Sequence, residues 1–376
     1  MTYRCLTAAM VAAALTAVLA TPVAAQPSYT FTRIADTRAF AGEVRSPVAL
    51  NDDGQVAFVA ATSAGVTGVF VGSGGAVTTA ADTSSVFTFF GFPGINGLGQ
   101  ATFFANKGAE LAGYYAGLDG ATTIVENRGA VGGFGGDIFS SPSGKFSTAE
   151  IVLRLPRQAQ AIVVGDGGRV IRIADTSGLF QLLDFDPRVN ASGLVAFHAT
   201  RRDLSEGIFV GKGGALSTIA DTSGPFVSFN DSPAINDPGD VLFEAVASAS
   251  NGSLITGLFL GSRGEIRSVL DSRGAFADFG RAPGLNAKGE IAFQGTTNAG
   301  LIGIFTGGDP AADRVIAVGD SLDGSVVSGF DPLSFASSLN NAGQIAFLVS
   351  LADGRTGVYR ADPARHGHDR RGRDEK

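Results

Sequence analysis

Three polar residues occupy one position of a repeated motif where the other copies are apolar. In three consecutive copies the residue after a motif Phe is His198, Glu244 or Gln294. In the remaining copies the same position holds Val59, Phe104, Ala149 and Leu348. An imidazole, a carboxylate and an amide together supply the hydrogen-bond donors and acceptors that hold a small ligand. In a repeat protein, a cluster of polar exceptions of this kind indicates a candidate site.

The segments that follow two of these residues predict where a ligand would lie. Arg201 follows His198 closely, and residues 245–256 after Glu244 form a longer connection than the repeat norm. If strands alternate regularly, both connections leave the same face of adjacent repeats, so we expect the main pocket near these residues and Gln294. Two alternatives stay open: a tolerated loop insertion, and buried polar groups that satisfy one another or the backbone. The other lengthened segments are residues 150–161 and 308–329.

Two short motifs match known sites but lack what those sites need. GDSL at residues 319–322 matches the nucleophile block of a lipase and esterase family. A catalytic Ser needs a neighbouring base, and the His residues after it, His366 and His368, belong to a polar C-terminal end. GGFGGDIFS at residues 132–140 matches a calcium-binding nonapeptide, but such sites form between stacked copies. We expect no catalysis at the first motif and a flexible Gly-rich loop at the second.

Acidic residues recur at one position of successive repeats. They are Asp36, Asp82, Glu126, Asp175, Asp221 and Asp271. A single site does not need one copy in every repeat, so we expect each acid to accept hydrogen bonds within its own turn. The sequence also contains no zinc-protease helix, phosphate-binding loop or dinucleotide fingerprint. We therefore expect no metal and no cofactor.

The repeat that must position all these residues begins with Asn and has Gly at its fourth place. Its copies are NDDGQVAF, NGLGQATF, SPSGKFST, NASGLVAF, NDPGDVLF, NAKGEIAF and NNAGQIAF, which begin at residues 51, 96, 141, 190, 236, 286 and 340. The copy at 141 is degenerate, with Ser in place of Asn. Asn followed by Gly predicts a type I turn closed by a glycine bulge, and the apolar run after it predicts a buried strand. A period of about 45 to 54 residues suits one blade of a propeller.

Two further repeated units complete the pattern of strands. Units such as GVFVG (residues 68–72) and IADT (residues 34–37) each recur seven times, and a short Gly-rich turn separates them. Each repeat therefore predicts four short antiparallel strands with no helical period. The ordered chain opens with IADT at residue 34 and closes with GVYR at residue 357. A ring would let the N-terminal strand complete the last blade and remove two exposed sheet edges.

These features predict an all-β fold, a seven-bladed β-propeller of four-stranded antiparallel blades closed by the N-terminal strand. A pair of β-sandwiches or an open β array remains the alternative. The copies with Asn first and Gly fourth resemble the motif of the bacterial NxxGxxAF tandem-repeat family over residues 29–362. The resemblance implies an exported protein with no assigned activity, usually with a C-terminal surface anchor. The end of this chain lacks a hydrophobic anchor, in contrast to that pattern.

Composition and the two ends of the chain bound the compartment and the partners. The chain has 376 residues, 44% hydrophobic residues and a net charge of −7. Residues 1–25 have the charge, apolar run and small-residue cleavage pattern of a secretory signal, and they contain the single Cys. We expect one domain over residues 26–362, a disordered tail at 363–376, a secreted or periplasmic location, and no membrane span after cleavage. The acidic charge argues against nucleic acid as a partner.

The sequence leaves two classes of function. The first is an exported, non-catalytic binding or scaffold protein that holds a glycan or an extracellular protein on one face of the ring. The absence of a catalytic constellation and the regularity of the repeats favour this class. The alternative is an extracellular hydrolase or lyase that acts on a glycan or a lactone, since one fold hosts many chemistries. We expect ligand-binding residues at His198, Arg201, Glu244 and Gln294 in either case.

Overall fold

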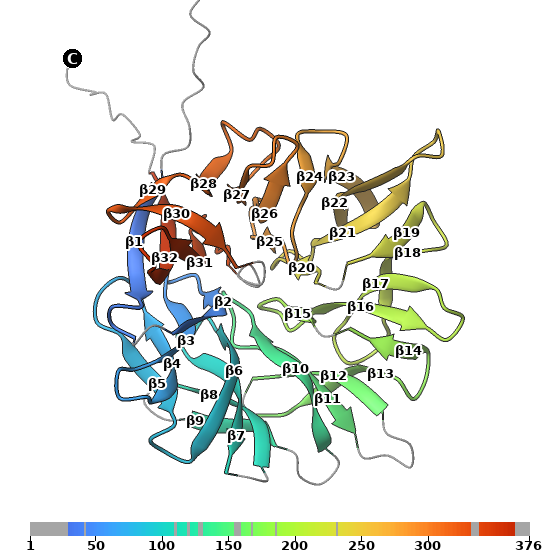
Figure 1. Ribbon diagram of the computed structural model, residues 1–376. Coiled ribbons are helices and arrows are strands. Elements are labelled where there is room, and N and C mark those ends of the chain that lie inside the picture. Colours follow the sequence, from blue (N-terminus) through green and yellow to red (C-terminus); the bar gives the residue numbers. More distant parts are fainter. Residues whose placement is uncertain are drawn as a thin grey trace, which may run out of the picture.

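The structure is all β, with seven antiparallel sheets arranged as blades around a central axis (Figure 1). It is a computed structural model that describes residues 29–40, 43–108, 111–118, 121–126, 131–153, 159–166, 168–184, 186–230, 232–331 and 338–364. No helix occurs among these residues, and the predicted seven-bladed propeller is confirmed. The expected signal (residues 1–25) and residues 365–376 of the expected tail lie outside the described residues.

Blades 1 to 3 each contain four strands, and the first strand of each blade contacts those of its neighbours near the axis. Blade 1 holds β2 (Val44–Leu50), β3 (Val56–Ala61), β4 (Thr67–Gly72) and β5 (Thr78–Asp82). Blade 2 holds β6 (Phe87–Ile95), β7 (Ala101–Lys107), β8 (Leu111–Gly117) and β9 (Ala121–Glu126). Blade 3 holds β10 (Val131–Ser140), β11 (Ser147–Leu153), β12 (Ala159–Gly165) and β13 (Ile171–Asp175).

Blades 4 to 6 follow the same order, but their inner strand is broken into two short pieces. Blade 4 holds β14 (Phe180–Leu183), β15 (Arg188–Val189), β16 (Val195–Arg201), β17 (Glu206–Gly211) and β18 (Ser217–Asp221). Blade 5 holds β19 (Phe226–Phe229), β20 (Ala234–Ile235), β21 (Val241–Ser248), β22 (Leu254–Ser262) and β23 (Glu265–Asp271). Blade 6 holds β24 (Phe276–Asp278), β25 (Gly284–Leu285), β26 (Ile291–Thr297), β27 (Ile302–Phe305) and β28 (Arg314–Ala317). Pro187, Pro233 and Pro283 stand just before β15, β20 and the Gly that opens β25, and Pro has no N–H for a ladder bond.

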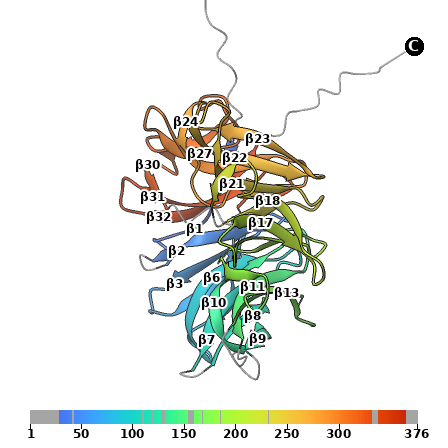
Figure 2. The same cartoon turned by 90° about the vertical axis from the view of Figure 1, so that its right-hand side faces the viewer.

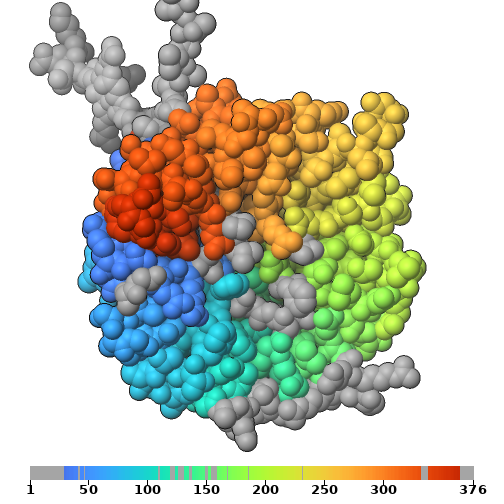
Figure 3. All heavy atoms as spheres, in the orientation of Figure 1, coloured from blue at the N-terminus to red at the C-terminus, as the bar shows by residue number. Residues whose placement is uncertain are grey.

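Blade 7 joins the two ends of the described chain. It holds β29 (Ser321–Leu322), β30 (Ser325–Phe330), β31 (Ile345–Leu351), β32 (Thr356–Pro363) and, as its outermost strand, β1 (Tyr29–Asp36). β1 runs antiparallel to β32, from Tyr29 opposite Pro363 to Asp36 opposite Gly357. The first and last coloured segments accordingly lie side by side (Figure 3), and the ring is seen from its edge in Figure 2. Closure by the N-terminal strand agrees with the prediction, and β32 extends one residue past the expected boundary at 362.

Asp323 fastens the closing strand to blade 7. Its carboxylate accepts hydrogen bonds from Arg33 of β1 (2.8 Å), from Arg355 (2.7 Å) and from the Tyr359 hydroxyl (3.1 Å). Burial opposes ionisation, but these donors prevail and hold the pKa of Asp323 at about 2. The residue follows directly after GDSL, whose last two residues form β29. The segment formed by GDSL and Asp323 (residues 319–323) therefore has a structural role in closing the ring.

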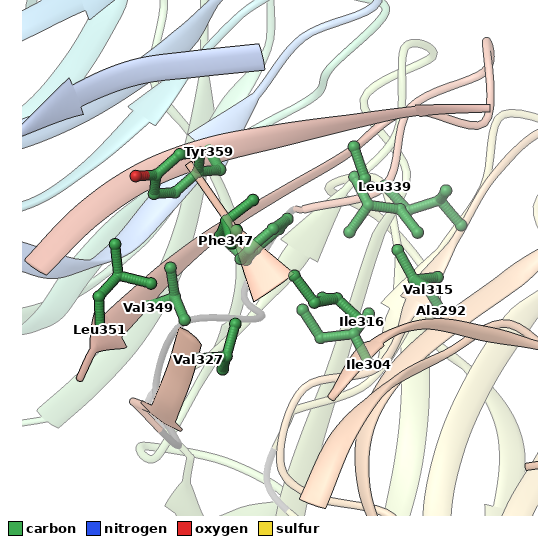
Figure 4. Close-up of a cluster of buried hydrophobic side chains, with 13 residues drawn as sticks. Ala292, Ile304, Val315, Ile316, Val327, Leu339, Phe347, Val349, Leu351 and Tyr359 are labelled. Carbon is green, nitrogen blue, oxygen red and sulfur yellow. The ribbon is translucent and has the colours of Figure 1, made fainter. Parts of the chain in front are cut away.

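The core consists of seven clusters, each packed between two adjacent blades. Figure 4 shows the cluster between blades 6 and 7, where Ile304 and Ile316 meet Phe347 and Leu339. The strand after each NxxG turn is the most deeply buried: Val56 through Ala60 of β3 are at most 1% exposed. The strand alternates, so the motif Phe faces the preceding blade and the next residue faces the following blade.

The NxxG turns have the predicted local geometry and one contact that was not predicted. In the first turn the Asn51 side-chain oxygen accepts from the Gln55 N–H at 2.9 Å, and Gly54 has φ of 75°. Five of the six Asn amides also donate to the backbone oxygen of the equivalent Asn one blade further on; the amide of Asn96, which precedes the degenerate turn, donates to the Gln100 side chain at 3.1 Å. The five bonds between blades join Asn51 to Asn96, Asn190 to Asn236, Asn236 to Asn286, Asn286 to Asn340 and Asn340 to Asn51. The turns thus form a hydrogen-bonded ring around the axis.

The degenerate turn at residues 141–144 fills the centre of this ring. The Pro142 oxygen accepts from the Asp52 N–H of blade 1 at 3.0 Å, and the Ser143 hydroxyl donates to Asp237 of blade 5 at 2.6 Å. Each of these contacts passes over an intervening blade, so the turn reaches across the axis. Two cavities lined by described residues near the axis have volumes of about 40 Å³ each, which is room for water and not for a ligand.

One sequence-based expectation about blade 3 is wrong. Residues 132–140 are not a loop but most of β10, the innermost strand of the blade. The β10–β11 ladder is interrupted between Val131 and Gly133 and again between Phe134 and Ile138. Such interruptions bend a strand, and Gly suits positions where a neighbouring backbone approaches closely.

Candidate functional site

The candidate site is a cleft on the face that carries the NxxG turns, beside blades 6 and 7. Its volume is about 630 Å³. We call it the blade 6–7 cleft; it is lined by Tyr29, Val269, Leu270, Lys288, Gly289, Glu290, Ile291, Thr306, Gly307, Gly308, Leu339, Ala342, Gly343 and Pro363. Sites for small ligands in proteins commonly have volumes of roughly 300 to 1,000 Å³. The cleft therefore has the size of a ligand site, unlike the cavities on the axis.

A lengthened hairpin between β27 and β28 builds the outer wall of the cleft. Thr306 and Asp313 close this hairpin through a backbone bond of 2.9 Å, and Asp309 accepts from the Ala311 N–H at 2.8 Å to shape its tip. A Cβ at Gly307 would lie 2.3 Å from the Asp313 carboxylate, so a side chain there would displace that carboxylate. This hairpin overlaps the start of residues 308–329, one of the segments that the sequence marks as lengthened.

The closing strand supplies Tyr29 to the same cleft. Burial raises the pKa of the Tyr29 hydroxyl; a hydrogen bond with Thr306 opposes this shift, and the negative charges of Glu290 and Asp313 add to it. Pro363, the register partner of Tyr29 on β32, also lines the cleft. The cleft is therefore complete only when β1 is paired in the ring.

The turn of blade 6 supplies two charged groups of opposite sign. Glu290 accepts from the Asn286 amide at 2.6 Å, which anchors its carboxylate to the NxxG turn. Lys288 lies two residues earlier on the same turn and is exposed. Ile291 and Leu339, which are 7% and 6% exposed, add an apolar floor. The arrangement offers hydrogen-bonding groups above an apolar surface, as ligand sites do.

His198 lies in the interface between blades 4 and 5 and is 5% exposed. Its Nδ1 atom contacts the carboxylate of Asp184 on the same blade, and its Nε2 atom lies 3.9 Å from Glu206. On the other side, its ring is 6.0 Å from that of Phe229 in blade 5. The imidazole is thus held between two carboxylates and an aromatic ring.

Arg201 is bound within blade 4. Its guanidinium donates to Asp221 at 2.9 Å and to Ser205 at 3.3 Å, and it lies over the ring of Phe209 at 4.7 Å from the centroid. These contacts join three strands of one blade. Arg201 is therefore committed to structure, in line with the alternative in which polar side chains satisfy one another.

Glu244 lies between blades 5 and 6 and is 9% exposed. Burial raises its pKa, a hydrogen bond from the Asn230 amide at 2.6 Å opposes that shift, Asp278 raises the pKa further and Arg281 lowers it. Asp278 and Arg281 belong to blade 6, so this carboxyl group is coupled electrostatically to the next blade.

Gln294 occupies the same register in blade 6, on the side that packs against blade 7. Its side-chain oxygen is buried and has no hydrogen-bond partner among the described residues. In blades 4 and 5 the partner comes from the residue six before the motif Asn, Asp184 or Asn230. In blade 6 that residue is Gly280, where a Cβ would lie 2.4 Å from the Gln294 backbone oxygen. No side chain can stand there to pair with Gln294.

The four predicted residues therefore do not share one pocket wall. His198, Glu244 and Gln294 stand at one register but in three successive interfaces, because each points to the following blade and a layer of Phe side chains separates it from the next. None of the four lines the blade 6–7 cleft. His198 and Glu244 are connected only indirectly. His198 contacts Phe229, and Asn230, the residue after Phe229, donates a hydrogen bond to Glu244.

The repeated acids serve their own turns, as predicted. Each side chain accepts from the backbone N–H two residues on. The pairs are Asp36 with Arg38, Asp82 with Ser84, Asp175 with Ser177, Asp221 with Ser223 and Asp271 with Arg273. The side chain of Glu126 lies outside the described ones. Among described residues there is no group of three or more His, Asp or Glu placed to hold a metal ion.

Sequence reasoning missed Tyr29 and Thr306 as site residues. The lengthened segment at 308–329 was the available signal for the hairpin, and the predicted ring closure was the signal for Tyr29. Neither indicated that the two would meet, because that depends on the width and tilt of blade 6.

In the described part of the chain, no helix has the length and apolar character to cross a membrane.

Comparison with known proteins identifies relatives in fold only. A family of unknown function, DUF7453, matches residues 222–362, less than half of the chain. No curated protein matches it. An oligogalacturonate lyase from Vibrio parahaemolyticus is similar over 90% of this chain and 98% of its own, with 12% identity and a TM-score of 0.56. The acylaminoacyl peptidase of Pyrococcus horikoshii is similar over 85% of this chain and 52% of its own, with 14% identity and a TM-score of 0.55.

Proposed function

We propose that this chain is an exported, non-catalytic binding module that holds its ligand, a glycan or an extracellular protein segment, in the blade 6–7 cleft. The observation that carries the proposal is the cleft itself, about 630 Å³ in volume and walled by turns and hairpins of a closed ring. A rigid wall lowers the entropy cost of binding, because few side chains must be ordered. The net charge of −7 argues against nucleic acid as the ligand.

The lining of the cleft supports binding over catalysis. Covalent or acid–base catalysis needs a nucleophile with a base in hydrogen-bond reach. The cleft is lined by no His or Cys, and its carboxylate, Glu290, is already an acceptor for Asn286. Burial raises the pKa of Tyr29, which keeps its hydroxyl protonated at neutral pH. The groups present are suited to hold a ligand and not to activate one.

Export is the second part of the proposal. Residues 1–25 have the pattern of a secretory signal, and the repeats resemble the exported NxxGxxAF family. We expect a secreted or periplasmic mature protein that begins at Gln26. Mass spectrometry of the protein purified from its native cells checks this, and an intact N-terminus at Met1 would contradict it.

The binding experiment compares the protein with a variant whose cleft is filled. Gly308→Trp places an indole against Leu270, whose side chain is the nearest atom to a Cβ at that position. Gly214→Trp is the matched control, since it lies in the equivalent hairpin of blade 4 with open space around it. We expect ligands found on glycan and peptide arrays to be lost by the first variant and retained by the second, at equal melting temperature. Equal binding by both variants would place the ligand elsewhere.

A second candidate function, a hydrolase or lyase, is favoured by one observation. The contact of His198 with Asp184 is the orienting pair of an acid–base catalyst, and the coupled Glu244 has a raised pKa. Under this candidate, His198, Arg201, Glu244 and Gln294 would be the binding residues. Turnover of a polysaccharide, lactone or ester that is abolished by His198→Ala, with the fold intact, would overturn the non-catalytic proposal.

A further inference from the structure

We infer that the ligand of the blade 6–7 cleft is a neutral saccharide. The inference rests on the proposed binding function and adds the chemical class of the ligand. Three properties of the cleft carry it: the sign of the field at its Tyr29 end, the free donors on its wall, and the shape of the backbone around it.

The Tyr29 end of the cleft carries a negative field. Glu290 and Asp313 both raise the pKa of the Tyr29 hydroxyl by their charge. Lys288 lines the same cleft but is not among the described groups that shift this pKa. A ligand carboxylate, sulfate or phosphate at this end would face two like charges in a partly desolvated place, which is unfavourable. A ligand hydroxyl instead donates to Glu290 and exchanges hydrogen bonds with Tyr29, so uncharged polyols are favoured.

The wall of the cleft offers donors that complement these acceptors. The backbone N–H groups of Gly307 and Gly308 donate to no described residue, and the Lys288 ammonium forms no ion pair among the described side chains. Because both glycines lack a side chain, a ligand can approach their backbone closely. Acceptors at one end and donors along the wall match the alternating hydroxyls of a sugar.

The apolar floor matches the other side of a sugar ring. Ile291 and Leu339 form it, with the ring of Pro363 at one edge. A pyranose has C–H faces that are buried favourably on such a surface, while its hydroxyls point to the rim. The volume of about 630 Å³ leaves room for a short oligosaccharide.

The backbone around the cleft argues against an extended peptide. Peptides that bind by adding a strand need an open strand edge along their length. The cleft is bordered mainly by turns at residues 288–290 and 342–343 and by the hairpin at 306–308. The edge strands β1 and β23 contribute only Tyr29 and the pair Val269 and Leu270. A peptide would leave its own N–H and C=O groups without a ladder to pair with.

The experiment uses matched pairs of neutral and acidic saccharides on the mature protein. Oligogalacturonate and its methyl ester share one backbone and differ in charge, and malto-, cello-, xylo- and chito-oligosaccharides extend the neutral set. Isothermal titration at low salt measures affinity. We expect at least one neutral saccharide to bind, and its uronate counterpart to bind about tenfold or more weakly, because its carboxylate is repelled by Glu290 and Asp313.

Variants of the cleft test whether its residues cause the preference for neutral over acidic saccharides. Tyr29→Phe and Glu290→Gln remove a hydroxyl and a charge with little change in shape, and each should weaken saccharide binding about tenfold. Glu290→Gln should also raise the relative affinity for the uronate. Glu265→Gln, an exposed position on β23 that does not line the cleft, should change neither value. Melting temperatures confirm that each variant is folded.

The outcomes separate this inference from the proposed function. Binding of only peptides or only anionic saccharides that Gly308→Trp abolishes would overturn the saccharide class and leave the binding function standing. Failure of every neutral saccharide to bind would also overturn the class. Saccharide binding that Gly308→Trp leaves unchanged would overturn the cleft as the site, and with it both proposals.

Discussion

The two faces of the ring use the same kind of residue in different ways. On the face of the NxxG turns, six Asn side chains are 0 to 3% exposed, and five of them bond to the next turn around the axis. On the opposite face, where the chain passes from blade to blade, the repeated Asp side chains bond within their own turns. Asp175 and Asp221 there are 15% and 18% exposed. One face is cross-linked from blade to blade. On the other face, side chains such as Arg202 and Asn298 join a hairpin only to the link that enters its own blade.

This difference has a simple physical cause and a functional consequence. The inner ends of the blades converge at the axis, so an Asn amide reaches the neighbouring backbone, whereas the links on the opposite face are spread along the circumference. The cleft lies on the cross-linked face, where Asn286 positions Glu290 directly. A ligand site built on this face is pre-organised by the ring of turns.

The exception on the opposite face is the closing blade. There Asp323 of the hairpin between β29 and β30 accepts from Arg355 of the last hairpin and from Arg33 of the first strand, so polar groups connect the two ends of the described chain. The ring is thus held shut twice, by this ion cluster and β1 on the outside and by the Asn340–Asn51 bond at the axis.

Deletion of β1 (Tyr29–Asp36) tests whether the outer strand holds the ring closed, and we expect it to have the largest effect on stability. It removes the buried Ile34 and Ala35 and the partly buried Tyr29 and Phe31, and it exposes the apolar surface that they cover. We therefore expect a loss of about 4 kcal/mol or more and a fall in melting temperature of at least 10 °C, by roughly 25 cal/mol per Å² of apolar surface. Deletion of residues 365–376 should leave the melting temperature unchanged. If both deletions behave alike, the ring of Asn turns closes the propeller without the strand.

Replacement of one buried turn residue tests the cross-linked face. Asn236→Ala removes a bond to the Asp240 N–H (2.8 Å) and one to the Asn286 oxygen (3.1 Å), so we expect a loss of about 3 kcal/mol. Asn251→Ala is the matched control, because Asn251 also caps a turn of blade 5, at Ser253, but is exposed on the opposite face. Chemical denaturation measures both; equal losses would show that the bond between blades adds nothing.

The ion cluster at Asp323 gives a prediction about pH. Its folded pKa of about 2 lies below the unfolded value of about 3.9, so its contribution is complete above pH 4 and is lost as pH falls towards 2. Because the side chain is 29% exposed, we expect only about 1 to 2 kcal/mol. Urea denaturation should show that the free energy of unfolding falls between pH 5 and pH 2, and that the fall is smaller in Asp323→Asn. An equal fall in both proteins would show that another group is responsible.

The smallest effect belongs to an ordinary turn of the opposite face. Arg273 holds the pKa of Asp271 at about 2 through hydrogen bonds, against a smaller effect of burial. Asp271→Ala removes the bonds from the Arg273 N–H, the Arg273 guanidinium and the Ser268 hydroxyl, all at one exposed turn. We expect a loss of about 1 kcal/mol, typical of a capping residue at an exposed turn. A denaturation midpoint shifted as far as that of Asn236→Ala would erase the distinction between the faces.

The sequence predicted the local structure correctly where the repeat is regular. Asn51 with Gly54 gave the turn, the alternation of Val56 to Ala60 gave the buried strand, and Asp175 with its neighbours gave the capped links. It predicted one pocket around His198 and Glu244, whereas the structure places these two residues in different interfaces. Equal register on neighbouring blades does not bring side chains together, because a layer of Phe lies between them.

The sequence by itself determined the period, the turn chemistry, the strand count and the phase that lets β1 close the ring, because these depend on hydrogen bonds and burial within about 50 residues. Tertiary structure alone decided three things. It set the bonds from five Asn amides to the next turn, the reach of residues 141–144 across the axis, and the meeting of Tyr29 with Thr306 and Glu290. Each depends on the distance between blades, which follows from the packing of side chains between seven sheets and is encoded in no single repeat.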